Sequence, residues 1–263
     1  MPSRASRQPV SVPAAGDERR RAALTARIAR RYRTVTEELT IGDLAIRFTR
    51  VANPDQVLEA KDASDAAGVV TAWQPFWAET WESAWAVAAA LLREDLHGQR
   101  VLDLGCGLGL SGAVAAARGA HVMLVDAAPP ALLFARLNCW PWRARVQFRR
   151  LDWRHERLPH SRFQRIIGSD ILYDREDWPF LERFWREHLA PTGGVLLGEP
   201  GRGTGDEIAA WLGLRGWQVQ VSSAPGYSGR RPLRLFRAVL AGSDAGASLA
   251  APAGAPLASR GEV

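Results

Sequence analysis

Residues 101–109 read VLDLGCGLG, an apolar run that leads directly into three glycines at every second position. Val101–Leu104 has the length and composition of a buried strand, and helix-forming residues follow Gly109. A tight glycine turn between a strand and a helix lets backbone N–H groups face a ligand, because glycine has no Cβ in the way. The stretch therefore predicts a ligand-binding strand–loop–helix unit.

Apolar runs and helical patterns alternate along the rest of the chain. The further runs that suit strands are Val122–Val125, Val146–Phe148 with Leu151, Ile166–Ile167 with Ile171–Leu172, Val195–Leu197, Trp217–Val221 and Leu233–Leu240. Helical stretches lie between most of them, namely Ser111–Arg118, Pro130–Cys139, Trp178–His188 and Thr204–Leu214. This order predicts an α/β fold, a Rossmann-like and mostly parallel sheet with helices on both faces.

A short hairpin and a helix are expected before this alternation. Thr34–Thr40 and Leu44–Val51 alternate polar and apolar residues around a Gly-Asp pair, which is typical of a β-hairpin. Thr80–Arg93 places its alanines and tryptophans at helical spacing.

The two ends of the chain differ in composition from this core. Residues 1–33 hold nine arginines against two acidic residues, and because the whole chain has a formal net charge of +6, the remainder is close to neutral. We expect residues 1–33 to form a disordered basic arm, 34–240 the folded domain, and 241–263 a flexible Ala/Gly/Pro tail. The arm is expected either to solubilise the chain or to bind anionic surfaces. The near-neutral core argues against a nucleic-acid partner.

Composition excludes several other classes of protein. Hydrophobic residues make up 47% of the 263 residues, too many for a wholly disordered chain. No apolar run approaches the ~20 residues of a membrane helix, and no secretory signal opens the sequence. Two cysteines and five histidines without ligand spacing predict neither a disulfide framework nor a metal site. We expect a cytoplasmic protein without a membrane partner.

An acidic residue at the end of the next expected strand indicates which kind of ligand the loop binds. Asp126 lies about 20 residues beyond Gly105, the offset of a carboxylate that accepts hydrogen bonds from ribose hydroxyls. A dinucleotide fingerprint would place its third glycine at position 110, where the sequence has Leu110. Binding of NAD, or a loop of purely structural use, remain the alternatives.

An acid followed by G-x-G-x-G, here Asp103 with Gly105, Gly107 and Gly109, resembles the pattern of class I S-adenosylmethionine-dependent methyltransferases. The resemblance implies S-adenosyl-L-methionine as the cofactor, a seven-stranded sheet of order 3-2-1-4-5-7-6, and Asp103 near the methionine end. It also implies that Asp152, after the third strand, faces the adenine amino group. Trp153 either stacks on the base or caps the sheet.

Three other motifs resemble a narrower group, the lysine methyltransferases of the electron-transfer flavoprotein β-subunit and their nicotinamide methylase-like bacterial relatives. These motifs are Pro75–Ala78 with Trp81 and an Ala-rich helix, Asp170-x-x-Tyr173, and Gly198–Arg202, in which Glu199 stands where relatives have Asp. Trp77 is expected to edge the cofactor or substrate pocket. Asp170 and Tyr173, after the fourth strand, are the catalytic candidates, and Asp170 also borders the cofactor.

The resemblance implies direct transfer of a methyl group, with a protein lysine as the expected acceptor. Only about one lysine in 2,500 is neutral at pH 7, so the acceptor must first lose a proton. We expect Asp170 mainly to orient the amine and secondarily to accept that proton. A small-molecule N- or O-methyltransferase and a non-catalytic cofactor-binding scaffold remain alternatives, and the oligomeric state is open.

Overall fold

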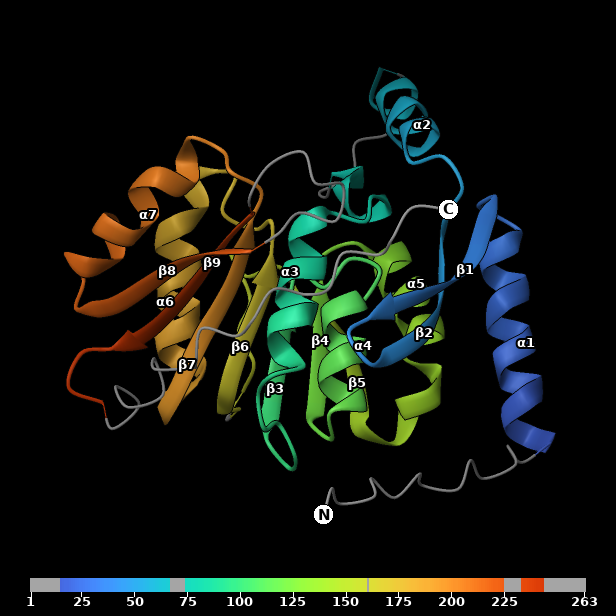
Figure 1. Ribbon diagram of the computed structural model, residues 1–263. Coiled ribbons are helices and arrows are strands. Elements are labelled where there is room, and N and C mark those ends of the chain that lie inside the picture. Colours follow the sequence, from blue (N-terminus) through green and yellow to red (C-terminus); the bar gives the residue numbers. More distant parts are fainter. Residues whose placement is uncertain (1–14, 67–73, 160, 225–232, 244–263) are drawn as a thin grey trace, which may run out of the picture.

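The computed structural model describes residues 15–66, 74–159, 161–224 and 233–243. Its centre is a sheet of seven strands in the order β5-β4-β3-β6-β7-β9-β8 (Figure 1). The strands are β3 (Arg100–Leu104), β4 (His121–Asp126), β5 (Val146–Arg150), β6 (Phe163–Ser169), β7 (Leu189–Glu199), β8 (Trp217–Ala224) and β9 (Leu233–Leu240). All pairs are parallel except β7–β9 and β8–β9. Numbered along the chain from β3, this is the order 3-2-1-4-5-7-6, so the expected topology is confirmed.

Helices cover both faces of the sheet (Figure 1). The helices are α1 (Ala15–Ala29), α2 (Asp55–Ala66), α3 (Glu82–Leu91), α4 (Leu110–Ala117), α5 (Pro129–Asn138), α6 (Trp178–His188) and α7 (Thr204–Gly213), with short 3-10 turns η1 (Pro75–Ala78), η2 (Trp140–Arg145) and η3 (Arg175–Asp177). Buried side chains form two clusters, one under α3, α4 and α5 and one under α6 and α7. Ile167 belongs to the first cluster and its neighbour Ile166 to the second, because successive side chains of a strand point to opposite faces of the sheet.

A hairpin of β1 (Thr34–Ile41) and β2 (Leu44–Val51) precedes the sheet, as the alternation predicts. The hairpin is hydrogen-bonded to the domain through the fully buried Asn138 of α5, whose Oδ1 accepts the Thr49 N–H at 2.8 Å. The Asn138 amide nitrogen donates to the carbonyls of Thr49 and Leu108, at 3.0 and 2.9 Å. One amide thus joins the hairpin to the glycine loop, and a buried amide with these partners satisfied stabilises that junction.

The expectation of a disordered arm over residues 1–33 is wrong for residues 15–29, which form α1. Ile28 is 1% exposed, and Leu24 and Tyr32 pack against the same core cluster. The Tyr32 ring meets those of Trp77 and Phe134 at 5.4 and 5.8 Å between centroids. Apolar residues four apart share a helix face, and the surrounding arginines hide that stripe in the sequence. Residues 1–14 and most of the expected tail lie outside the described residues.

The fourth strand ends earlier than the apolar run suggests. β6 stops at Ser169, and Asp170 has a φ of 56°, in the left-handed region that side chains other than glycine seldom adopt. Ile171 and Leu172 are therefore buried beyond the strand and are not part of it. The turn places Asp170 at the carboxyl end of the sheet.

Candidate active site

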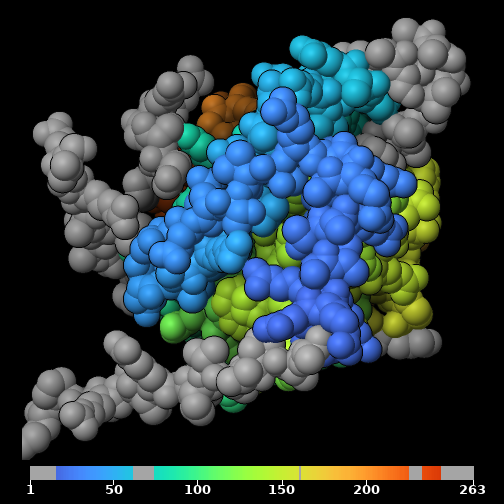
Figure 2. Space-filling model, turned by 90° about the vertical axis from the view of Figure 1, so that its right-hand side faces the viewer, coloured from blue at the N-terminus to red at the C-terminus, as the bar shows by residue number. Residues whose placement is uncertain are grey.

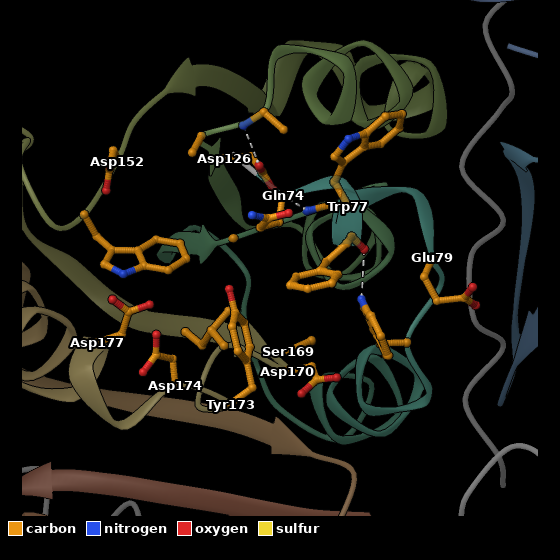
Figure 3. Close-up of a pocket in the computed structure, with 18 of the residues that line it drawn as sticks. Gln74, Trp77, Glu79, Asp126, Asp152, Ser169, Asp170, Tyr173, Asp174 and Asp177 are labelled. Atoms are coloured by element: carbon orange, nitrogen blue, oxygen red, sulfur yellow. Dashed lines mark hydrogen bonds between the residues drawn. The ribbon is translucent and has the colours of Figure 1, made fainter. Parts of the chain in front are cut away.

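A cavity of about 410 Å³ opens at the carboxyl ends of β3, β4 and β6 and beside the segment that follows β5. Open α/β sheets bind ligands at this edge, and the volume lies within the ~300–1,000 Å³ of cofactor pockets. Asp126 and Asp152 lie on one side of it, and Tyr173, Asp174 and Asp177 lie on the other (Figure 3). Gly105 and Gly107 form part of its wall.

The glycine loop needs glycine for two different reasons. Gly105 and Gly109 both have positive φ, 67° and 83°. A Cβ at Gly105 would lie 2.9 Å from Cγ2 of Ile171, whereas one at Gly109 would lie 2.8 Å from Cβ of Ala135. Gly105 therefore shapes the cavity wall, while Gly109 allows α5 to approach the start of α4 and does not reach the cavity.

Asp126 holds the loop in place and also faces the cavity. Its Oδ2 accepts the N–H of Gly107 and its Oδ1 that of Ala128, both at 2.9 Å. Burial raises the pKa of Asp126 to about 6, although these hydrogen bonds oppose the rise. Each carboxylate oxygen can accept further hydrogen bonds. The carboxylate is thus placed to accept ribose hydroxyls, and that role stays a prediction.

Asp103 lies behind the loop, away from the cavity. It is 2% exposed, its Oδ2 accepts the Gly112 N–H at 2.8 Å, and it is not part of the cavity wall. Burial raises its pKa to about 7. The structure therefore does not bring Asp103 directly to a ligand in the cavity. It stabilises the first turn of α4, whose N–H groups have no partners within the helix.

The segment after β5 supplies the wall at the expected adenine end. The Trp153 ring lies 3.4 Å from the position of a Cβ on Gly105, and its buried Nε1 has no hydrogen-bond partner among the described residues. Asp152 lines the cavity beside it, and its Oδ1 accepts the N–H of Arg154 at 2.9 Å. An unpartnered buried N–H in a cavity wall is suited to a polar ligand atom.

Trp77 reaches the cavity with only part of its side chain. It is 5% exposed, and its ring packs against Tyr32 and Phe134, with 5.7 Å between the Trp77 and Phe134 centroids. Its Nε1 is buried without a described partner. Trp77 therefore joins the cavity wall to the core of α1 and α5.

Asp170 and Tyr173 lie across the cavity from Asp126, at the expected acceptor end (Figure 3). Oδ2 of Asp170 pairs with Nη2 of Arg202 at 2.9 Å, while the buried Oδ1 has no partner among the described residues. Burial raises the pKa of Asp170 to about 6, and Arg202 opposes the rise. The Tyr173 ring meets Phe76 edge-on at 5.7 Å. A buried carboxylate oxygen therefore lies beside an aromatic wall.

Glu199 supports this end of the site. It is 1% exposed and accepts the N–H of Gly201 at 2.9 Å and Nε of Arg234 at 2.8 Å. The turn that it fixes brings Arg202 to Asp170, with the guanidinium carbon 5.4 Å from the Trp81 ring centroid. The motif Gly198–Arg202 thus acts by positioning Arg202.

The wall of the cavity is strongly acidic, a feature that the sequence motifs did not predict. Six carboxylates line it against one arginine, Arg154: Glu79, Asp126, Asp152, Asp170, Asp174 and Asp177. Arg154 pairs with Asp177 and, at 3.4 Å, with Asp174. Asp174 and Asp177 lie within four residues after the Asp-x-x-Tyr motif. Their closeness to that motif is the feature of the sequence from which a role in the cavity wall could have been predicted. The negative charge that Arg154 does not neutralise favours cationic ligands in the cavity.

No cation-binding cluster accompanies these acids. Within the described ranges, no group of three or more His, Cys, Asp or Glu side chains is arranged to hold a metal ion. Among the helices that the structure describes, none is both long and apolar enough to cross a membrane.

The sheet order, the glycine loop and the acid after the next strand define a Rossmann-like domain for a nucleoside-containing cofactor. Residues 101–193 match the family model described as "Methyltransferase domain". The chain carries a class I S-adenosylmethionine-dependent methyltransferase domain, and S-adenosylmethionine is the cofactor of this fold.

Two curated relatives represent two kinds of acceptor. The electron transfer flavoprotein beta subunit lysine methyltransferase of Xenopus laevis is 35% identical over 140 residues, 49% of this chain and 53% of that protein. Phosphoethanolamine N-methyltransferase 1 of Zea mays is 29% identical over 134 residues, 49% of this chain and 26% of that protein. The chain thus spans about half or less of the length of these relatives.

A solved structure shows the same fold at lower identity. The glycopeptide N-methyltransferase MtfA complexed with S-adenosyl-L-methionine has a TM-score of 0.51 and 20% identity, over 59% of this chain and 86% of that chain.

The cavity fits the cofactor that the family implies. The Trp153 Nε1–H and Asp170 Oδ1 are buried polar atoms without partners among the described residues, both residues line the cavity, and Asp126 on the same wall keeps free acceptor capacity. An adenine, a ribose and a cationic sulfonium offer an acceptor, hydroxyl donors and a positive charge, which are complementary to these three groups.

Proposed function

We propose that this chain methylates the side-chain amine of a protein lysine. The observation that carries the proposal is the buried, unpartnered Oδ1 of Asp170 beside the aromatic pair Tyr173 and Phe76. A carboxylate oxygen in that position can accept a hydrogen bond from an ammonium or amine, and the rings can enclose the methylene stem. Relatives that carry "lysine methyltransferase" in their names agree with it.

The acidic wall distinguishes this acceptor from a phosphorylated small molecule. Arg154 and Arg202 pair with three of the wall's carboxylates, whereas Glu79 and Asp152 have no ion pair among the described residues, so a phosphate monoester would meet net like charge there. A lysine ammonium is attracted by the same charges. The small-molecule alternative suggested by the phosphoethanolamine relative is therefore disfavoured, although a cationic small amine would fit the charge as well.

The chain's own residues act mainly by positioning. When bound, S-adenosylmethionine supplies an activated methyl group on a sulfonium. Asp126 is placed to hold the ribose and the Tyr173–Phe76 pair to narrow the acceptor entry. Asp170 orients the amine, and because its pKa is about 6, it is mostly ionised at pH 7 and can receive the amine proton.

Deprotonation of the acceptor is the main energetic demand. A free lysine has to gain about 4.6 kcal/mol to be neutral at pH 7. Desolvation in the cavity lowers the lysine pKa, and the aromatic walls exclude water from it. Asp170 stabilises the charged amine and opposes this shift, so its contribution lies chiefly in the geometry of approach.

Transfer of labelled methyl groups tests the proposal. Bacterial lysate is separated by dialysis into macromolecules and small molecules, and each fraction is incubated with the protein and tritiated-methyl S-adenosylmethionine. We expect label in the protein fraction, and less of it with the Asp170→Asn variant. Label confined to the small-molecule fraction would replace the lysine acceptor with a small amine. No transfer to either fraction would support a non-catalytic scaffold.

A further inference from the structure

A second hollow, about 260 Å³ in volume, lies between α1 and α5 on the side of the domain away from β8. Figure 2 shows α1, in blue, lying across this face, and α1 contacts α5. We call this hollow the α1–α5 groove. Its lining includes four arginines, Arg27, Arg31, Arg136 and Arg150. Methyl transfer in the cavity described above does not use it.

The four arginines are not neutralised within the part of the chain that the structure describes. No carboxylate lines the groove, and no ion pair involves any of the four. Nη1 of Arg136 and Nε of Arg150 donate instead to the carbonyls of Leu132 and Ala127, both at 3.4 Å. Burial and the neighbouring Arg27 lower the pKa of Arg136. Four uncompensated cations around one hollow favour an anionic occupant.

The apolar part of the lining limits what that anion can be. It consists of Pro129, Pro130, Leu132 and Leu133. Two prolines at the start of α5 remove two of the N–H groups with which the first turn of a helix can hold a bare phosphate. The groove therefore combines apolar and basic lining residues, which suits a segment that carries acidic side chains beside an apolar one.

Nucleic acid fits the groove less well. Among the described residues, none that lines the groove is an aromatic on which a base could stack. The same turn that supplies Pro129 and Pro130 to the groove supplies Ala127 and Ala128 to the catalytic cavity. Phosphates that run on from the groove would meet the acidic wall of that cavity, whereas a protein can present acidic residues to one site and a lysine to the other.

We propose that the α1–α5 groove docks an acidic segment, with an apolar side chain, of the protein whose lysine is methylated. The proposal rests on the proposed function for the identity of the partner, but the binding itself does not require methyl transfer. Arg27 and Arg31 are one helical turn apart, on the same face of the chain at the end of α1. Arg19 and Arg20 are equally exposed on α1 and lie outside the groove, so they provide a control of equal charge.

Fluorescence anisotropy with a labelled peptide of glutamate, leucine and glycine measures the docking directly. We expect Arg27→Gln with Arg31→Gln to weaken binding at least about fivefold, and Arg19→Gln with Arg20→Gln less than about twofold. A peptide with glutamine in place of glutamate should not bind. Circular dichroism verifies that both variants keep the fold, as the exposure of all four arginines predicts.

Three outcomes would overturn the proposal. Equal weakening by both double variants would mean general attraction by a basic surface. Unchanged binding in the groove variant would place the peptide elsewhere, and tighter binding of an oligothymidine of equal charge would favour nucleic acid. The protein could bind the peptide through the groove and yet transfer no methyl group to lysine. This result would support the docking site and refute only the proposed function.

Discussion

Asp170 and Arg202, 32 positions apart in the chain, form an ion pair of 2.9 Å that uses only one oxygen of the Asp170 carboxylate. The Asp170 side chain is 3% exposed, the residue lines the cavity, and its second carboxylate oxygen is buried without a partner among the described residues. Arg202 therefore fixes the rotamer of Asp170 and stabilises its charge while leaving an oxygen for the acceptor. Arg202 is a positioning residue in this account, because it acts through Asp170.

Replacement of Arg202 should change how the methyl-transfer rate depends on pH. Arg202 holds the pKa of Asp170 down against burial, so Arg202→Gln should raise it above about 6. Asp170 then becomes protonated at a higher pH, and the rate of the variant relative to the original protein should fall as pH decreases from 8 to 6. Arg202→Lys, which keeps the charge, should restore much of the rate. A rate ratio that is independent of pH would contradict the coupling.

Asp170→Asn and Tyr173→Ala should each lower the methyl-transfer rate at least about tenfold, equivalent to ~1.4 kcal/mol of transition-state stabilisation. Both side chains lie across the cavity from Asp126, so the affinity for S-adenosylhomocysteine should change much less. Steady-state rates and calorimetry on the same preparations separate the two effects. Full turnover in the variants, or a loss of cofactor binding as large as the loss of rate, would remove this pair from the acceptor site.

Asp126→Ala should weaken cofactor binding by about 1–3 kcal/mol, because charge-assisted hydrogen bonds to the ribose are lost. The same carboxylate holds Gly107 and Ala128, so part of the effect arises from a looser loop. Calorimetry with S-adenosylmethionine and with its deoxyribose analogues separates the two parts. An Asp126→Ala variant that is folded and keeps full affinity would refute the ribose assignment.

Ile28→Ala should lower the free energy of unfolding by about 2–4 kcal/mol, the usual cost of removing a buried aliphatic side chain. The effect is expected only because α1 packs on the domain. Leu214→Ala, at a side chain that is 87% exposed, is the control and should change stability by less than about 0.5 kcal/mol. Urea unfolding measures both. Equally small changes in both variants would mean that α1 does not pack on the domain, as expected for a disordered arm.

The fold could be predicted because strongly apolar strands alternate with helices around one glycine loop. Val101–Leu104 and Val122–Val125 were located to within a residue at most ends, since buried parallel strands are continuous apolar runs. Helix α2 was missed because Asp55–Ala66 has little apolar periodicity. The end of β6 was missed because a positive φ at Asp170 is set by tertiary contacts and leaves no trace in composition.

The site was predicted in part, and the remainder depends on contacts between distant residues. Asp126, Trp153 and Asp170 lie together on the cavity wall, since the carboxyl ends of parallel strands meet at one edge. Asp103 belongs to the glycine-loop motif, but it accepts a hydrogen bond from the Gly112 N–H and lies behind the loop, away from the cavity. The spacing of residues in the sequence cannot predict this orientation. Asn138 joins the hairpin to the loop through residues that are 89 and 30 positions away in the sequence, so no local pattern predicts this contact.

The position of the transferred methyl group tests the central claim most directly. Protein bands labelled with tritiated-methyl S-adenosylmethionine are hydrolysed to amino acids, and the label is separated by chromatography, with the Asp170→Asn variant as control. We expect the label to elute as ε-N-methyllysine and to decrease about tenfold or more in the variant. Label in any other amino acid, or equal labelling by Asp170→Asn, would contradict it.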